Sequence, residues 1–349
     1  MDTLTQGLLG AACGQAFYAE RLGWRRATTW GAVGGLLPDI DVLPIAALGS
    51  LAEFRYHRAL THALWFSLVA GPLLGWAVQR FQARGRGGAG AGALGDWIGL
   101  FVVALVTHPL LDLFTTYGTM LLWPLPERFA LDAVAIVDPF YSAILALALL
   151  VGWRARASLA QSSAIAALVL TTAFLFYGLH LNHAAESEAR RQLAPRASAA
   201  LTVRAYPTLF QPWLRRVVAR DGRDVSVGLL STWRPHAIDF RSFREPADAR
   251  IATALATPEG QLFSWFAMGQ TTARVVDTAS GAAVEVDDLR YGYGEAPDHG
   301  LWGLRFALDA QGRPSGAVER YNRRPRGALL STFGVIWRAT FSPEETAKP

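Results

Sequence analysis

The sequence predicts a multi-pass α-helical membrane domain followed by a soluble α+β domain with a mainly antiparallel β-sheet. Of 349 residues, 52% are hydrophobic and only 17% are charged. The apolar excess lies mainly before residue 182, as expected where lipid rather than water solvates the chain. From about Pro195 the pattern changes to short β-like runs separated by turn signals. We therefore expect a membrane domain at residues 1–185 and a soluble domain at residues 195–349.

Four apolar segments approach the roughly 20 residues that cross a hydrocarbon layer of about 30 Å. They are residues 64–78, 97–113, 136–153 and 164–181. Two weaker segments, residues 4–19 and 28–48, are interrupted by glycines and by LLPDIDVLP. We expect them to be membrane-associated at a depth that the sequence leaves open. The N-terminus has an acid at Asp2 and no basic start, so we expect the first helix not to be cleaved as a signal peptide.

Arginine positions predict the orientation of these segments. If each segment crosses the membrane once, most arginines near the segment ends collect on one side, which the positive-inside rule makes cytoplasmic. This group comprises Arg21, Arg25, Arg26, Arg80, Arg84, Arg86, Arg154 and Arg156, whereas the other side receives Arg55, Arg58 and Arg128. The chain after residue 181 is then expected outside the cytoplasm.

The C-terminal half carries the signals of short strands. Runs such as RRVVAR, DVSVGLL and TARVVDT are separated by DG, SG and QG dipeptides, and residues 301–314 read as a strand entering a turn. No repeat of fixed period and no glycine-rich phosphate loop is present, so nucleotide binding has no support. The net charge of +5 comes from dispersed arginines and one lysine, Lys348, without a basic run. We therefore expect no nucleic-acid partner.

A histidine and a carboxylate interrupt the apolar run that begins at Trp97. His108 and Asp112 are four residues apart. On a helix they lie on one face about 6 Å apart, so both can reach one ion. Pro109 removes one backbone hydrogen bond, which predicts a kink there. The alternative is that Asp112 only satisfies His108 inside a helix bundle.

Other ionisable residues lie at or inside apolar stretches. They are Asp39 and Asp41 in LLPDIDVLP, His57 and His62 in RYHRALTHALW, and Asp138 in AIVDPFY. Ionisable groups at membrane depth cost several kcal/mol unless they pair, bind a cation or face water. Taken singly, the two aspartates could cap a broken helix and His57 could be an interfacial residue. The arginine-based orientation places all of these groups toward the outer side, which favours one functional site.

The donor types indicate a metal site without thiolates, because Cys13 is the single cysteine. Imidazoles and carboxylates suit Zn²⁺ best, and Mn²⁺ and Fe²⁺ are compatible with them. Three histidines and four aspartates exceed one tetrahedral site, so a two-ion site is consistent with the set. One carboxylate, with Asp41 and Asp138 as candidates, would then bridge or act as general base. Arg58 is a candidate to bind a phosphate oxygen, or else an arginine that snorkels to headgroups.

Two threonines and two histidines each allow two interpretations. Thr61 and Thr107 precede histidines and could hydrogen-bond to them, although threonine in a membrane helix more often bonds its own backbone. His180 and His183 lie three residues apart at the end of the last apolar segment. They are either further ligands or markers of the helix exit.

The motifs MDTLTQGLLGAACG, LLPDIDVLP, HRALTHALW, THPLLDLFTTYGTMLLWP and IVDPFY occur in this order over roughly residues 1–185. In these motifs and their order, the chain resembles the bacterial membrane-bound metal-dependent hydrolase family with a YdjM/YbcI-type domain. The resemblance implies a metal-dependent hydrolase of the inner membrane and leaves its substrate open. The family pattern usually has His where this chain has Gln6. Either one ion is then lost, another group replaces the ligand, or activity is reduced.

A fainter similarity, of the HxxxD spacing from His108 to Asp112, is to the zinc-dependent phospholipases C. It favours a phospholipid or another phosphoester as substrate, with membrane lipid as the surrounding partner. The rival hypothesis is a non-catalytic membrane protein that binds a structural ion or conducts cations, with the soluble domain as an interaction module. Few ionisable residues lie toward the cytoplasmic ends, which favours a one-sided hydrolytic site. A transporter predicts inverted repeats, which the sequence does not display.

Overall fold

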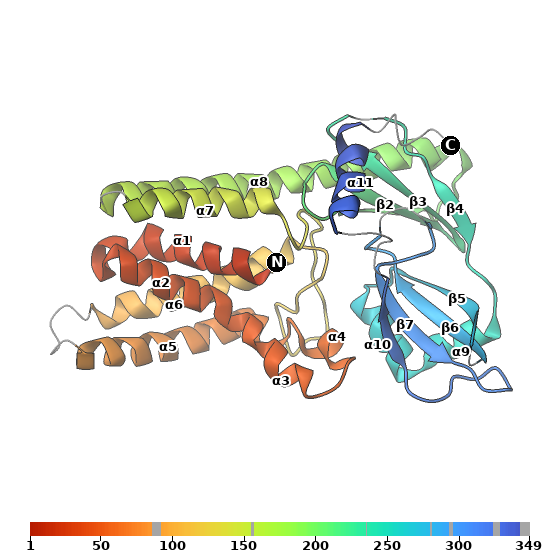
Figure 1. Ribbon diagram of the computed structural model, residues 1–349, viewed down its shortest axis with the longest axis horizontal. Coiled ribbons are helices and arrows are strands. Elements are labelled where there is room, and N and C mark those ends of the chain that lie inside the picture. Colours follow the sequence, from red (N-terminus) through yellow and green to blue (C-terminus); the bar gives the residue numbers. More distant parts are fainter. Residues whose placement is uncertain are drawn as a thin grey trace. The chain divides into compact units, whose positions relative to one another are not determined.

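A computed structural model of the chain describes residues 1–85, 92–154, 157–234, 236–279, 281–292, 296–323 and 329–342. The chain divides into two compact units, Met1–Tyr177 and Gly178–Pro349. The division falls inside one long helix, α8 (Ala157–Leu193), which runs through it without interruption (Figure 1). The sequence-based limits of 1–185 and 195–349 stay predictions.

The first unit is entirely helical apart from its connecting segments, which confirms the predicted class. Its elements are α1 (Thr3–Leu22), α2 (Trp24–Leu36), η1 (Leu37–Asp41), α3 (Val42–Ala46), α4 (Ala52–Tyr56), η2 (Leu60–His62), α5 (Leu64–Gly85), α6 (Leu94–Leu113), α7 (Pro139–Arg154) and the first part of α8. The weak segment at residues 28–48 is broken into α2, η1 and α3, as its glycines and prolines predict.

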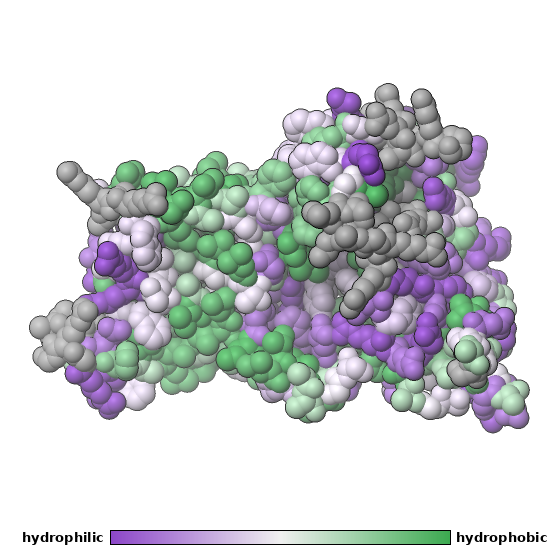
Figure 2. All heavy atoms as spheres, in the orientation of Figure 1, coloured by the Kyte–Doolittle hydropathy of each residue, from purple (hydrophilic) through white to green (hydrophobic). Residues whose placement is uncertain are grey.

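Among the described residues, two helices are long and apolar enough to cross a membrane, namely Leu94–Leu113 and Ser158–Arg196. A third crossing results if Ala52–His62 and Leu64–Arg84, which meet at an angle of 59°, form one broken span. The predicted span at 136–153 is an apolar helix that begins only at Pro139 and is 16 residues long. Figure 2 shows hydrophobic residues, in green, over much of the visible face of this helical unit.

Glycines let α1 and α2 approach closely. A Cβ atom added at Gly31 would lie 2.3 Å from the carbonyl oxygen of Gly10, and one added at Gly35 would lie 2.4 Å from that of Gln6. Small residues at this spacing are typical of tightly packed membrane helices, because they allow backbone-to-backbone contact. The packing fixes the C-terminal end of α2, and with it η1, against the start of α1.

We expect Gly31→Ala to separate α1 from α2 and to destabilise the protein. An added methyl group in a closely packed interface costs about 1–3 kcal/mol, which corresponds to a decrease in melting temperature of roughly 2–10 °C. The matched control is Gly95→Ala in α6, where an added Cβ has no atom within 4 Å. Thermal unfolding in detergent measures both, and equal melting temperatures for the two variants would contradict the close approach.

The second unit contains two four-stranded antiparallel sheets, as the predicted fold class requires. The first sheet has β1 (Thr202–Pro207), β2 (Leu214–Asp221), β3 (Asp224–Ser231) and β4 (Arg241–Arg244), and the second has β5 (Thr271–Thr278), β6 (Gly281–Asp288), β7 (Trp302–Ala307) and β8 (Glu319–Asn322). Strands follow one another in sequence order within each sheet. Short helices accompany them, namely η3 (Ala194–Arg196), α9 (Ala249–Ala256), α10 (Pro258–Phe266) and α11 (Leu329–Phe341).

Two of the predicted turn signals lie where the chain reverses its direction. Gly222, in the left-handed region at φ 62°, joins β2 to β3, and Gly312, at φ 76°, lies in the turn after β7. Glycine adopts this conformation without the steric cost that other residues incur. The SG signal includes Ser280, which lies outside the described residues. In this unit Ala185 and Ala189 of α8 join the core formed by β1, β2 and β3.

Candidate metal centre

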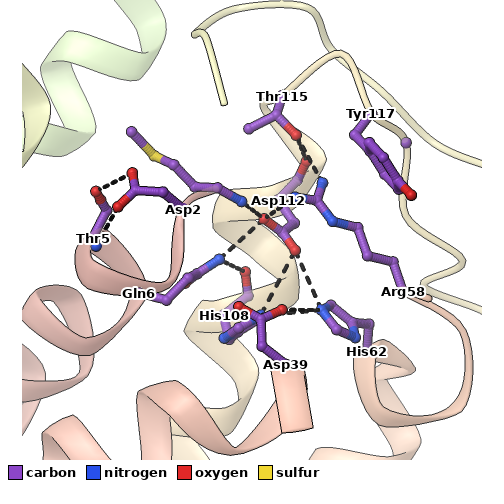
Figure 3. A network of polar contacts seen from close by, with 12 residues as sticks. Asp2, Thr5, Gln6, Asp39, Arg58, His62, His108, Asp112, Thr115 and Tyr117 are labelled. Carbon is purple, nitrogen blue, oxygen red and sulfur yellow. Dashed lines mark hydrogen bonds and ion pairs between the residues drawn. The ribbon is translucent and has the colours of Figure 1, made fainter. Parts of the chain in front are cut away.

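Four side chains from three separate elements converge inside the first unit. They are Asp39 from η1, His62 from η2, and His108 and Asp112 from α6, and one donor atom of each lies within 4.8 Å of all the others (Figure 3). All four residues were predicted as ligands from the sequence. The i and i+4 spacing on α6 supplies two donors, and the short helices η1 and η2 supply the other two.

The distances between donor atoms fit a small tetrahedral ion. His62 Nε2 lies 3.0 Å from His108 Nε2 and 3.3 Å from Asp112 Oδ2. Asp39 Oδ1 lies 3.4 Å from each of these two nitrogens, and His108 Nε2 lies 3.7 Å from Asp112 Oδ2. A regular tetrahedron with ligand distances of about 2.0–2.1 Å, as for zinc, has edges of about 3.3–3.4 Å. These five separations are therefore compatible with one small, tetrahedrally coordinated ion.

Both histidines are held so that their Nε2 atoms can act as metal ligands. His108 Nδ1 donates to the carbonyl oxygen of Gly35, at 2.6 Å. His62 Nδ1 lies 3.0 Å from Thr61 Oγ1, and that hydroxyl donates to Asp41 Oδ2 at 2.9 Å. These partners assign the proton to Nδ1 in each ring, which leaves the Nε2 lone pair directed into the group. The close packing of α1 against α2 therefore helps to orient His108, because it fixes the position of the Gly35 carbonyl.

The two carboxylate oxygens of Asp112 have different surroundings. Oδ1 accepts a hydrogen bond from Gln6 Nε2 at 3.0 Å, forms an ion pair with Arg58 Nη2 at 3.1 Å, and also contacts the amine of Met1. Oδ2 is buried and has no hydrogen-bond partner among the described residues. A buried carboxylate oxygen without a donor is costly. An ion between Oδ2 and the two imidazoles would satisfy it.

The predicted ligand His57 lies beside the group and not in it. Its Nδ1 is 2.9 Å from Asp41 Oδ1. Burial alone would raise the pKa of Asp41, but His57, His62 and the Thr61 hydroxyl together hold that pKa below its ordinary value. Asp41 therefore supports two neighbours, His57 directly and His62 through Thr61. The structure does not place Asp41 among the four converging donors.

Asp138 also lies outside the four-residue group. Its Oδ1 accepts hydrogen bonds from the backbone N–H groups of Phe140, at 3.0 Å, and Tyr141, at 3.2 Å, at the start of α7. An aspartate followed by proline is a frequent start of a helix, because the carboxylate binds the free N–H groups of the first turn. The structure therefore places Asp138 as the N-cap of α7.

Arg58 points inward and is only 3% exposed, unlike an arginine that snorkels to headgroups. Besides its contact with Asp112, it donates from Nη1 to Thr115 Oγ1 at 2.9 Å, and its guanidinium carbon lies 4.7 Å from the ring centre of Tyr117. Its Nε has no hydrogen-bond partner among the described residues. The backbone of Arg58 is left-handed, at φ 62°, a conformation that costs about 1–2 kcal/mol outside glycine.

A cavity of about 570 Å³ adjoins the group. Its lining combines the polar residues Asp39, Glu53, His57 and Arg58 with apolar residues of α2, η1 and α3. Asp39, whose side chain is 13% exposed, is the converging donor in its wall. The cavity is large enough for a small organic ligand.

Two further residues take part in the site: the family resemblance already pointed to Gln6 as a usual ligand position, whereas nothing in the sequence pointed to Gly35. Gln6 donates to Asp112 Oδ1 and to the backbone oxygen of His108, so it positions the ligand helix and does not belong to the four donors. No sequence signal identifies a backbone carbonyl such as that of Gly35. His180 and His183 are exposed on α8 and do not belong to the four-residue group.

We expect Thr61→Val to weaken metal binding by about 10- to 100-fold, because it removes the hydroxyl that orients His62. The matched control is Thr107→Val. Thr107 also precedes a histidine, but its hydroxyl donates to the backbone oxygens of Val103 and Ala104 in its own helix. Competition with a chromophoric chelator measures both affinities. Equal affinities for the two variants would show that Thr61 does not hold His62.

Comparison with known proteins gives one finding for the helical unit. The family model described as YdjM inner membrane protein matches residues 1–183, which include all four converging residues and Arg58. No curated protein and no solved structure matches the chain.

Proposed function

The chain belongs to the YdjM inner membrane protein family, and on this premise we propose that it is a metal-dependent hydrolase of phosphoesters. One divalent cation, with Zn²⁺ favoured by the two imidazoles, would be held by Asp39, His62, His108 and Asp112. We place the site and the C-terminal unit outside the cytoplasm, following the distribution of arginines.

One observation carries this proposal, namely the cavity against the donor group. Four protein ligands by themselves favour a structural ion, because catalytic zinc sites usually keep one position open. A purely structural site needs no adjacent cavity. Here Asp39 and Arg58 belong both to the site and to the cavity wall, so a bound molecule could reach the donor group and a guanidinium together.

The residues of the cavity wall suit phosphoester hydrolysis. A cation held by the four donors would supply Lewis acidity, which polarises a phosphoryl oxygen and acidifies water. Arg58 would bind another phosphoryl oxygen by a charge-assisted hydrogen bond. His57 Nδ1 is occupied by Asp41, which leaves Nε2 to carry a proton. Overall, the oxygen of water bonds to phosphorus, one P–O bond breaks, and one water proton ends on the leaving oxygen.

Purified protein in nanodiscs tests this function. We expect hydrolysis of phosphodiester or phosphomonoester probes that stops on chelation and returns when Zn²⁺, Mn²⁺ or Fe²⁺ is added. Metal analysis of the same preparation is the necessary companion measurement. One tightly bound ion without turnover of any probe would favour the rival hypothesis of a structural metal site in an interaction protein.

A further inference from the structure

The cavity beside the four donors has a polar end and an apolar end. Asp39, Glu53, His57 and Arg58 are the charged and titratable residues of its lining, and we call them the polar end. The apolar wall comes from the end of α2, from η1 and from α3, through Val33, Leu36, Leu37, Ile40, Val42 and Leu43. A ligand that fills the whole cavity must therefore be amphipathic, with an anionic group at Arg58 and an apolar part against this wall.

The apolar wall continues onto the outer surface. Leu36 is 39% exposed, Ile40 is 54% exposed and Leu43 is 68% exposed. Contiguous exposed apolar residues mark an interaction surface. In a unit with two to three candidate membrane spans, the natural neighbour of such a surface is the hydrocarbon of the bilayer. The rim of the cavity is thus suited to an apolar chain that extends from the cavity into lipid.

We propose that the cavity takes a phosphoester lipid, with its phosphate at Arg58 beside the four donors and its hydrocarbon chain along Leu36, Ile40 and Leu43. This inference rests on the proposed function and adds the substrate class. The volume of about 570 Å³ is that of a site for a drug-sized molecule. It holds the headgroup and the first part of a chain, while the rest of the lipid stays in the bilayer.

At the polar end, Arg58 and a cation at the four donors would supply the positive charge that a phosphate requires beside the carboxylates of Asp39 and Glu53. Arg58 contacts Asp112 and also lines the cavity. A phosphate oxygen would be a suitable acceptor. A water-soluble phosphoester could use this end equally well, but it would leave the wall of Leu36, Ile40 and Leu43 in contact with water. The apolar wall therefore distinguishes a lipid from a soluble ester.

Photolabelling tests lipid binding without any turnover. The probe is a phosphatidylglycerol with a diazirine in one acyl chain, placed in nanodiscs with chelator-treated protein. We expect labelled peptides from residues 33–43, competition by unlabelled phosphatidylglycerol, and no competition by excess glycerol phosphate. Labelling spread evenly over the span helices, or equal competition by glycerol phosphate, would overturn the inference.

A pair of matched double variants gives the kinetic test. Ile40→Ala/Leu43→Ala shortens the apolar wall, whereas Leu68→Ala/Leu73→Ala removes leucines of similar exposure, 60% and 64%, from α5 outside the cavity lining. Burial of one methylene group is worth about a fourfold change in an equilibrium constant. We therefore expect the wall variant to lose about 10- to 100-fold in kcat/KM on long-chain phosphatidylglycerol and little on a soluble short-chain ester. The α5 variant should match the unchanged protein on both substrates.

The two tests separate the failure of the lipid inference from the failure of the proposed function. One outcome is that the soluble ester is turned over faster than the long-chain lipid and that Ile40→Ala/Leu43→Ala has no effect. This outcome would reject the lipid as substrate and retain the proposed hydrolase activity. Specific photolabelling at residues 33–43 without turnover of either substrate would retain lipid binding and reject hydrolysis.

Discussion

Metal content is expected to fall from about one ion per chain to background when His108 is replaced by alanine, and cation-dependent hydrolysis should disappear with it. Structural zinc binding is worth about 10–16 kcal/mol in total, so one of four ligands accounts for roughly 3 kcal/mol, or at least a 100-fold loss of affinity. Asp112→Asn should have a similar effect, because it keeps the shape of the side chain and removes the charge that faces the two imidazoles.

The control for this experiment is His183→Ala, which removes an exposed histidine from α8. Metal is measured by mass spectrometry after detergent purification, and circular dichroism checks that each variant is folded. Unchanged metal content in both His108→Ala and Asp112→Asn, with His183→Ala also unchanged, would refute the ligand assignment. Loss of metal in all three variants would instead point to binding away from the four-residue group.

Arg58→Ala is expected to lower kcat/KM by about 100- to 1,000-fold, the range observed when a single donor to a developing negative charge is removed. Arg58→Lys should recover only part of the loss, because a lysine ammonium cannot reproduce the planar guanidinium that contacts both Asp112 and Thr115. Metal content should fall much less than in His108→Ala, since Arg58 contacts Asp112 Oδ1 and leaves Oδ2 available.

A matched control lies three residues earlier, because Arg55 is exposed. Arg55→Ala should leave turnover unchanged. The informative measurement is the comparison of metal content with turnover in Arg58→Ala. Parallel loss of both would show that Arg58 supports the fold around Asp112 and does not bind substrate.

The sequence singled out all four residues that converge, and the physical reasons are clear for two of them. His108 and Asp112 share a helix, so their spacing alone places both on one face. Asp39 and His62 were found as ionisable residues in apolar surroundings, a criterion that identifies candidates but not their partners. The same criterion also selected Asp138, which caps α7, because a capping aspartate and a ligand aspartate look alike in sequence.

His62 belongs to the four-residue group and His57 does not, and this difference depends on backbone geometry that the local sequence does not encode. Between them the chain turns through the left-handed residue Arg58 and the short helix η2. That turn directs His62 into the group. It leaves His57 in the cavity wall, where its Nδ1 contacts Asp41. The predicted fold class was confirmed for both units. Interruption of the weak segment after α2 was predicted from its prolines and glycines, whereas the contact of Gly35 with His108 arises from helix packing.

The unequal surroundings of the two Asp112 oxygens also bear on ion selectivity. Because Gln6 and Arg58 engage Oδ1, Asp112 offers a single oxygen to an ion. The remaining donors are two imidazole nitrogens and one oxygen of Asp39. Calcium requires six to eight oxygen ligands, and magnesium prefers an octahedron of oxygens. Physiological concentrations of these two abundant ions should therefore not displace a transition metal from this centre.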